Sequence, residues 1–208
     1  ANAYAEVTID GTTQTAFTGD TNPDGREVVI LRGGGLWINA DNCTVTGLDN
    51  TTIFADRSNC TFENNSVMGL NIYGGEGGAG SLVRNNTGGG NLKIDQSNNN
   101  LVVGNTFHRV RVLGCITGGR PSTNNRIGGP TPAERNYIMG LGTWNSQGIP
   151  GGYAVQLFNA IGTIIENNQI GTTPDGLSQG HLATTIGVYF DTENYDTSRF
   201  GGLKPGVG

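Results

Sequence analysis

The stretch CTFENNSV, residues 60–67, decides the fold because variants of it recur along the chain. Related segments are CTVTGLDN from 43, SLVRNNTG from 81, NLVVGNTF from 100 and TIIENNQI from 163. Less regular copies are NNRIGG from 124 and RNYIMG from 135. The copies lie about 20 residues apart, or a multiple of that, and such a period indicates a protein built by stacking short repeats.

Within each copy, inward residues alternate with polar ones, which is the period of a β-strand with one buried face. The inward columns are Cys43, Cys60, Ser81, Asn100 and Thr163, and beside them Val45, Phe62, Val83, Val102 and Ile165. An upstream strand has the inward pairs Leu36/Ile38, Ile53/Ala55, Leu70/Ile72, Leu92/Ile94, Val110/Val112, Val155/Leu157 and Ile186/Val188. A third, shorter strand carries Val67, Phe107 and Ile170. Three strands in each of about seven or eight repeats, over residues 36–190, predict an all-β parallel β-helix, or solenoid.

The doubled asparagines have a structural explanation in such a fold. Asn65, Asn86, Asn105 and Asn168 share one position at a bend, whereas Leu48 takes it in the first copy. Adjacent strands lie about 4.8 Å apart, so stacked amides can hydrogen-bond as a ladder. Asn98 is expected outside this ladder, in a solvated turn. We interpret five N-x-S/T sequons as products of the same turn chemistry rather than glycosylation sites: Asn42, Asn50, Asn59, Asn64 and Asn85.

Composition narrows the classes of function. Glycine contributes 36 of 208 residues and hydrophobic residues make up 35% of the chain, which suits short strands joined by frequent turns. The formal net charge of -5 argues against a nucleic-acid partner, because such proteins carry a basic surface. The chain has no run of about 18 apolar residues, so the sequence predicts no membrane span.

The three cysteines are an odd number, which excludes a fully paired intramolecular set. Cys43 and Cys60 are expected to stack inward on adjacent repeats, where free thiols and a disulfide both remain open at a separation of about 4.8 Å. Cys115 is the third. With only His108 and His181 and no C-x-x-C motif, the sequence predicts no metal site, and it contains no cofactor motif.

Two segments carry a resemblance to a known group of proteins. NRIGGPTPAERNYIMG at 125–140 and NNQIGTTPDGLSQG at 167–180 resemble repeats of bacterial secreted and cell-surface right-handed parallel β-helix proteins, in the pectate-lyase-like superfamily. The resemblance covers most of residues 36–190. It implies a right-handed coil and an extracellular or cell-surface location. It implies no single activity, because such repeats occur in enzymes, adhesins and scaffolds alike.

The outward residues of the upstream strand form a flat face on which a polymer can lie. One expected column is Trp37, Phe54, Asn71, Lys93, Arg111, Gln156 and Gly187, and its neighbour is Asn39, Asp56, Tyr73, Asp95, Leu113, Phe158 and Tyr189. Aromatic rings stack on sugar rings. Candidate substrate-binding residues are therefore Trp37, Phe54, Tyr73, Phe158 and Tyr189. The alternative is that a loop, 74–80 or 139–152, or a partner subunit covers these rings.

If the face is catalytic, the candidate residues are Asp56, Lys93, Asp95 and Arg111. Asp56 and Asp95 are expected two repeats apart, at about 9.6 Å between backbones, near the separation of acid and base in an inverting glycosidase. Lys93 and Arg111 on consecutive repeats would instead neutralise a uronate for β-elimination. The polygalacturonase motifs are absent apart from QGH at 179–181, and RPSTNNR at 120–126 departs from the R-x-P-x-x-R of pectate lyases.

Neither end of the chain shows a capping helix in its sequence. Residues 1–35 alternate like strands and turns, and residues 191–208 form a polar tail. Uncapped strand edges recruit other chains, so either the chain continues in a longer protein or its ends pair with copies of itself. We expect an extracellular structural or surface β-helix that self-associates end to end, into a filament. The alternatives are a small polysaccharide lyase or glycoside hydrolase, or a glycan-binding module without catalysis.

Overall fold

The computed structural model describes residues 6–19, 28–29, 35–75, 78–115, 119–140, 152–177, 185–191 and 198–201. Almost all of the regular structure is β-strand, and every pair of named strands is parallel. The prediction of an all-β chain with parallel pairing is therefore confirmed.

Two large sheets contain most of the strands, and in each the strand order follows the sequence. The eight-stranded sheet consists of β1 (Thr8–Asp10), β4 (Thr44–Thr46), β7 (Thr61–Glu63), β9 (Leu82–Arg84), β11 (Leu101–Val103), β15 (Arg126–Ile127), β19 (Ile164–Ile165) and β22 (Arg199–Phe200). The seven-stranded sheet consists of β3 (Gly35–Ile38), β6 (Thr51–Ala55), β8 (Val67–Tyr73), β10 (Asn91–Asp95), β13 (Arg109–Leu113), β17 (Gly152–Phe158) and β21 (Thr185–Asp191).

Smaller sheets fill the corners between the large ones. A three-stranded sheet contains β12 (Thr106–Phe107), β16 (Tyr137–Ile138) and β20 (Gln169–Ile170), and two-stranded sheets pair β2 (Val28–Val29) with β5 (Leu48–Asp49) and β14 (Ser122–Thr123) with β18 (Ala160–Ile161). Two short helices complete the described elements, namely α1 (Thr12–Thr18) and the 3-10 helix η1 (Pro132–Glu134).

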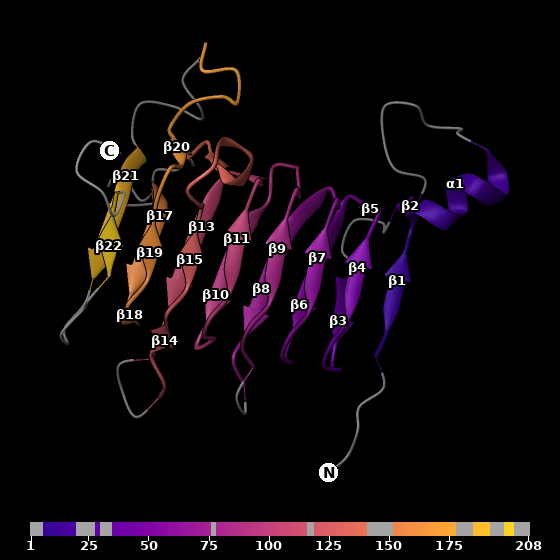
Figure 1. Cartoon of the computed structure of the whole chain (residues 1–208), viewed down its shortest axis with the longest axis horizontal. Coiled ribbons are helices and arrows are strands. Elements are labelled where there is room, and N and C mark those ends of the chain that lie inside the picture. The colour runs from indigo at the N-terminus through magenta and orange to yellow at the C-terminus, as the bar shows by residue number, and fades with distance from the viewer. Residues whose placement is uncertain are drawn as a thin grey trace, which may run out of the picture.

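The strands lie side by side along the long axis of the molecule, from β1 at one end to β21 and β22 at the other (Figure 1). We call a strand of the eight-stranded sheet, together with the next strand of the seven-stranded sheet, a rung. Pairing extends beyond residues 36–190, because β1 pairs with β4 and β22 pairs with β19.

The inward columns predicted from the alternation are buried. Along the eight-stranded sheet, at most 1% of the surface of each inward side chain is exposed at Val45, Phe62, Val83, Val102, Ile127 and Ile165. Along the seven-stranded sheet the same is true of Ile53, Leu70, Leu92, Val110 and Val155, and of Ala55, Ile72, Ile94, Val112 and Leu157. These columns form one hydrophobic cluster, and burial of this kind is the main favourable term in folding.

The predicted asparagine ladder is present and has one more member than expected. The Nδ2 atoms of Asn65, Asn86, Asn105 and Asn136 each donate to the Oδ1 of the next amide, at 3.1, 3.0, 3.0 and 2.9 Å, and the last acceptor is Asn168. Each Oδ1 also accepts the backbone N–H of the preceding rung, beginning with Leu48 at 3.0 Å. The ladder therefore begins one rung after Leu48, as predicted, and buried amides use their hydrogen-bonding capacity.

The first asparagine of each doublet has a separate role. Asn64, Asn85 and Asn167 have φ values of 55°, 55° and 50°, in the left-handed region that asparagine tolerates. The same is true of all five sequon asparagines, with φ between 49° and 57°. In these three pairs, the first asparagine therefore turns the chain and the second enters the ladder.

The opposite corner carries a more mixed column. Cys43, Cys60, Ser81, Asn100 and Thr163 are buried there, as predicted, and Asn125 joins them. Both Cys43 and Cys60 are free thiols, and each Sγ donates to the carbonyl of Ala40, at 3.2 and 3.5 Å. Burial raises the pKa of the Cys60 thiol to about 11.

Three local predictions are wrong. Residues 1–35 were expected to contain only strands and turns, but they include the helix α1. This helix begins where the Asp10 carboxylate accepts the N–H of Thr12 at 2.9 Å. Phe17 on the helix is 88% exposed. Asn98 is half-buried rather than solvated, because its Oδ1 accepts the N–H of Thr123 at 2.7 Å.

The third concerns the last rung of the seven-stranded sheet. Val188 pairs with Val155 and Phe190 pairs with Leu157, so the inward pair is Val188/Phe190 rather than Ile186/Val188. The alternation in this segment fits both registers, because a shift of two residues leaves every side chain on the same face.

Candidate functional site

The candidate site lies on the outward face of the seven-stranded sheet. Strand pairing places Trp37, Phe54, Asn71, Lys93, Arg111, Gln156 and Tyr189 in one column. The register agrees with the predicted column through Gln156. Tyr189 then replaces Gly187, because of the shift in β21. The neighbouring column contains Tyr73, Asp95, Leu113 and Phe158, and Asp56, directly after Ala55, lies level with Tyr73.

The N-terminal part of this face is aromatic. Trp37 and Phe54 stack with ring centroids 4.7 Å apart and an interplanar angle of 13°. Trp37 is 61% exposed, so one ring face remains open to solvent. At the other end of the sheet, Tyr153 and Tyr189 stack at 4.3 Å. Both pairs offer flat surfaces of the type that sugar rings contact.

The centre of the face is charged. Lys93 Nζ lies 2.6 Å from the Asp95 carboxylate and 5.1 Å from the centroid of the Tyr73 ring. Arg111, directly opposite Lys93 in the pairing, donates its Nε to Gln156 Oε1 at 3.0 Å. Because Lys93 and Asp95 neutralise each other, the Arg111 guanidinium leaves a net positive charge at this point.

A second guanidinium strengthens that charge. Arg109 Nε donates to the carbonyl of Tyr153 at 3.1 Å. Burial, followed by the positive charge of Arg111, lowers the pKa of Arg109 from its ordinary value. Arg109 and Arg111 therefore form a cationic strip in a chain whose net charge is -5, and anions are the ligands that this strip favours.

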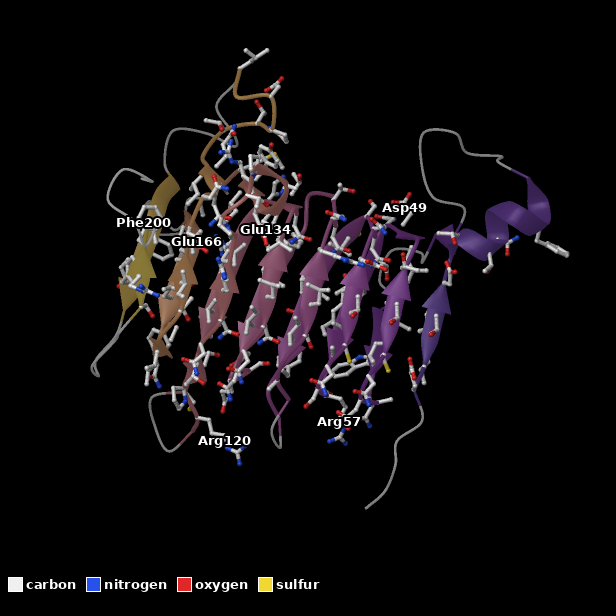
Figure 2. The ribbon with its side chains drawn as sticks, viewed as in Figure 1. Asp49, Arg57, Arg120, Glu134, Glu166 and Phe200 are labelled. Atoms are coloured by element: carbon white, nitrogen blue, oxygen red, sulfur yellow. The ribbon has the colours of Figure 1, made fainter. Side chains whose placement is uncertain are left out.

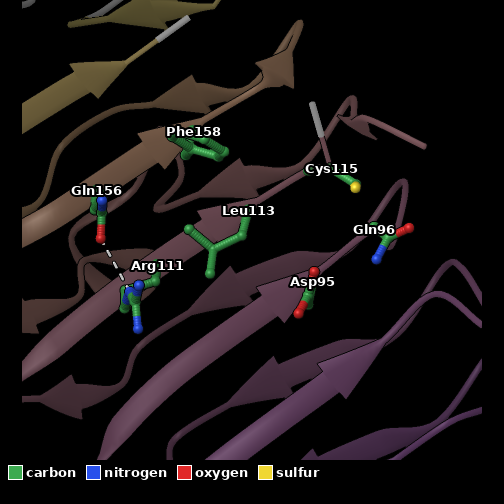
Figure 3. A pocket seen from close by; sticks show the side chains of 8 residues that line it. Asp95, Gln96, Arg111, Leu113, Cys115, Gln156 and Phe158 are labelled. Atoms are coloured by element: carbon green, nitrogen blue, oxygen red, sulfur yellow. Dashed lines mark hydrogen bonds between the residues drawn. The ribbon is translucent and has the colours of Figure 1, made fainter. Parts of the chain in front are cut away.

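A groove of about 630 Å³ adjoins the cationic strip (Figure 3). Its lining residues are Asp95, Gln96, Arg111, Leu113, Gly114, Cys115, Gln156 and Phe158. Figure 3 shows Arg111 and Gln156 joined by their hydrogen bond, with Leu113 and Phe158 farther along the strands. The groove thus combines a cation, a carboxylate, two amides and an apolar wall.

The structure brings some of the predicted site residues together and separates others. Asp95, Arg111 and Phe158 line the groove, whereas Trp37, Phe54 and Tyr189 do not. Tyr73 lies between Asp56 and Asp95 in the strand order, so those carboxylates are two rungs apart, as predicted. The roles assigned to all these residues stay predictions.

Sequence reasoning missed the groove residues at the ends of the strands. Gln96 follows β10 with φ of 53°, and Cys115 follows β13 by two residues. Alternation identifies outward residues within strands, but it says nothing about bends. The one sequence signal for a groove residue at a bend was Gln96, which stands where neighbouring repeats have asparagine or glycine.

Neither a metal centre nor a membrane-spanning helix is present in the part of the chain that the structure describes. There, no group of three or more His, Cys, Asp or Glu side chains is arranged to hold a metal ion. None of the described helices is long and apolar enough to cross a membrane. His181 lies outside the described residues, and so does most of the loop 139–152 that we considered as a cover for the face.

No protein-family model, curated protein or solved structure matches this chain.

Proposed function

We propose that the chain is a right-handed parallel β-helix that serves as an extracellular structural or surface scaffold and self-associates end to end. The in-register stacking of two parallel sheets, in sequence order, supports the coil. The right-handed sense and the extracellular location rest on the resemblance of residues 125–140 and 167–180 to bacterial repeats.

The observation that carries the self-association is the exposure of two aromatic side chains on the last described strands, β21 and β22. Phe190 and Phe200 occupy inward columns, and yet they are 43% and 60% exposed. Phe200 lies on the last strand of its sheet, away from the middle of the stack (Figure 2). An unpaired strand edge beside exposed aromatic side chains is a typical docking surface for another strand.

Sedimentation velocity over a wide range of protein concentrations tests this proposal. We expect a series of species larger than the monomer, whose share grows with concentration. A single monomeric species at every concentration would overturn the self-association. For the location, we expect surface proteolysis of intact source cells, or analysis of their medium, to find the chain; recovery only from inside the cells would contradict it.

A second function is favoured by the cationic strip and its groove, namely binding of an acidic polysaccharide, with or without cleavage. A uronate carboxylate would lie against Arg111 while apolar sugar faces contact Phe158. Calorimetry with polygalacturonate checks this: Arg111→Gln should weaken binding, whereas Arg84→Gln, the same change on the eight-stranded sheet, should not. Release of unsaturated uronates, detected by ultraviolet absorbance, would indicate a lyase. Equal binding by both variants, or none by the parent, would remove this function.

A further inference from the structure

The backbone of the eight-stranded sheet has the same hydrogen bond at successive rungs. The amides of Gly128, Glu166 and Gly201 donate to the carbonyls of Val102, Ile127 and Ile165 in the rung before, at 2.8, 3.0 and 2.9 Å. Asp10 occupies the equivalent donor position on β1, and Phe200 occupies the equivalent acceptor position on β22. In the described chain no strand lies beyond β1 or β22. A donor at one end therefore matches an acceptor at the other.

The inward column of this sheet also ends in two apolar residues. It begins with Ile9 on β1, which is partly buried, and ends with Phe200 on β22, which is 60% exposed. Between them every member is at most 1% exposed, because each has a rung on both sides. Placing β1 of a second copy against β22 would give Phe200 the neighbour that it lacks.

Charge is complementary across the same two ends. Within the molecule, Arg126 forms an ion pair with Glu166, which lies one rung later and two residues farther along the strand direction. Arg199 is in the column of Arg126, and Asp10 is in the column of Glu166. Arg199 is exposed and has no ion pair within the described residues. Among the described residues, Thr12 donates to one oxygen of the Asp10 carboxylate, and the other oxygen has no partner.

We propose that copies of this chain join head to tail, with β22 of one copy pairing in parallel with β1 of the next. The inference rests on the proposed self-association and specifies its joint. Phe200 packs on Ile9 of the next copy, the carbonyl of Phe200 accepts the amide of Asp10, and Arg199 pairs with Asp10 as Arg126 pairs with Glu166. The two surfaces are different and the joint continues the direction in which the strands stack. Each contact therefore adds a copy along the same axis, and the result is a filament rather than a closed ring.

A charge exchange tests the joint. Arg199→Glu and Asp10→Lys should each abolish species larger than the monomer, because each places like charges at every joint. An equimolar mixture should assemble again, since the carboxylate introduced by the first variant then meets the ammonium introduced by the second, and the native pair meets at the alternate joints. Rescue by mixing has no explanation in misfolding of either variant. A mixture that stays monomeric, although both variants keep the parent's circular dichroism spectrum, would overturn the joint.

A second pair of variants leaves Asp10 and its contact with Thr12 untouched. Phe200→Asp should also abolish assembly, whereas Met68→Asp, at an exposed apolar side chain on β8 in the middle of the stack, should not. If the parent assembles and Phe200→Asp assembles equally well, the joint is wrong and the proposed self-association stands. Assembly that stops at a dimer contradicts the head-to-tail arrangement and favours contact between two C-terminal ends. A parent that is monomeric at all concentrations removes both proposals.

Discussion

The middle of the stack and its C-terminal end are built from the same columns of residues, and they differ in what covers those columns. Val102 and Ile127, with rungs on both sides, are fully buried, whereas Phe200, the last member of that column, is 60% exposed. In the ladder, Asn105 has an amide on each side, and within the described residues Asn168 has one on one side only. Burial in this protein therefore comes from neighbouring rungs, and a repeated residue has a different energetic role at the end.

The largest expected effect is on the free energy of unfolding, and it should differ between two phenylalanines of one inward column. Phe62→Ala should destabilise the protein by about 3 to 5 kcal/mol, because it leaves a cavity between two rungs. Phe200→Ala should change stability by less than about 0.5 kcal/mol, because the side chain is mostly exposed in the single chain. Urea denaturation below the concentration of assembly measures both. Equal midpoints would show that the end is covered as well as the middle.

The next effect concerns the centre of the ladder. Asn105→Leu removes the acceptor of the Asn86 amide and side chain, and it removes a donor to Asn136 and Val83. Buried groups left without partners should cost about 1 to 3 kcal/mol in the free energy of unfolding. The matched control is Asn91→Leu, on an exposed strand position with no described side-chain hydrogen bond. If the two variants unfold at the same denaturant concentration, the ladder does not stabilise the fold.

A smaller effect is expected at the end of the ladder. Asn168→Leu also removes the acceptor of an amide and a side chain, those of Asn136, but Asn168 is only partly buried. The Asn168 Nδ2 has one described acceptor, the Ile127 carbonyl, whereas the Asn105 Nδ2 has three. Fewer hydrogen bonds are lost, so the cost should be about 0.5 to 1 kcal/mol. A loss as large as that of Asn105→Leu would contradict the difference between middle and end.

The smallest effect is a difference between the three cysteines in their alkylation in the folded protein, and it involves no change in stability. Cys43 and Cys60 lie inside the stack, and the raised pKa of Cys60, about 11, keeps its thiol protonated at pH 8. Cys115, half-buried at the groove, should therefore be the cysteine alkylated in the folded protein. Intact mass should show one label before denaturation and three after it, without reductant. Cys115→Ser should remove the first label, and one label after denaturation of the parent would indicate a Cys43–Cys60 bridge.

The sequence was most informative where residues repeat. Alternation predicted the inward columns because a strand with one buried face has period two, and the aligned asparagines predicted the ladder because stacked rungs bring identical amides together. Leu48, which replaces asparagine in the first copy, correctly predicted that the ladder begins one rung later, at Asn65. Asn136 was missed because residues 128–134, which include η1, separate it from the regular spacing.

Other features were hidden because their cause is not periodic. The register of β21 was ambiguous, since a shift of two residues preserves the alternation, and only pairing with β17 decides it. The helix α1 is too short to show a periodic pattern and depends on local contacts of Asp10 with Thr12. The groove was only partly predicted, because Gln96 and Cys115 reach it from bends, whose direction depends on tertiary structure.

Electron microscopy of the protein, at a concentration where sedimentation detects large species, tests the central claim most directly. If the C-terminal end binds the N-terminal end of another copy and so becomes covered like a rung in the middle, the images should show unbranched filaments one molecule wide. Their diffraction should contain a strong axial spacing of about 4.8 Å, because strand stacking continues through every joint. Discrete particles of one or two chains, or clusters without that axial spacing, would contradict the claim.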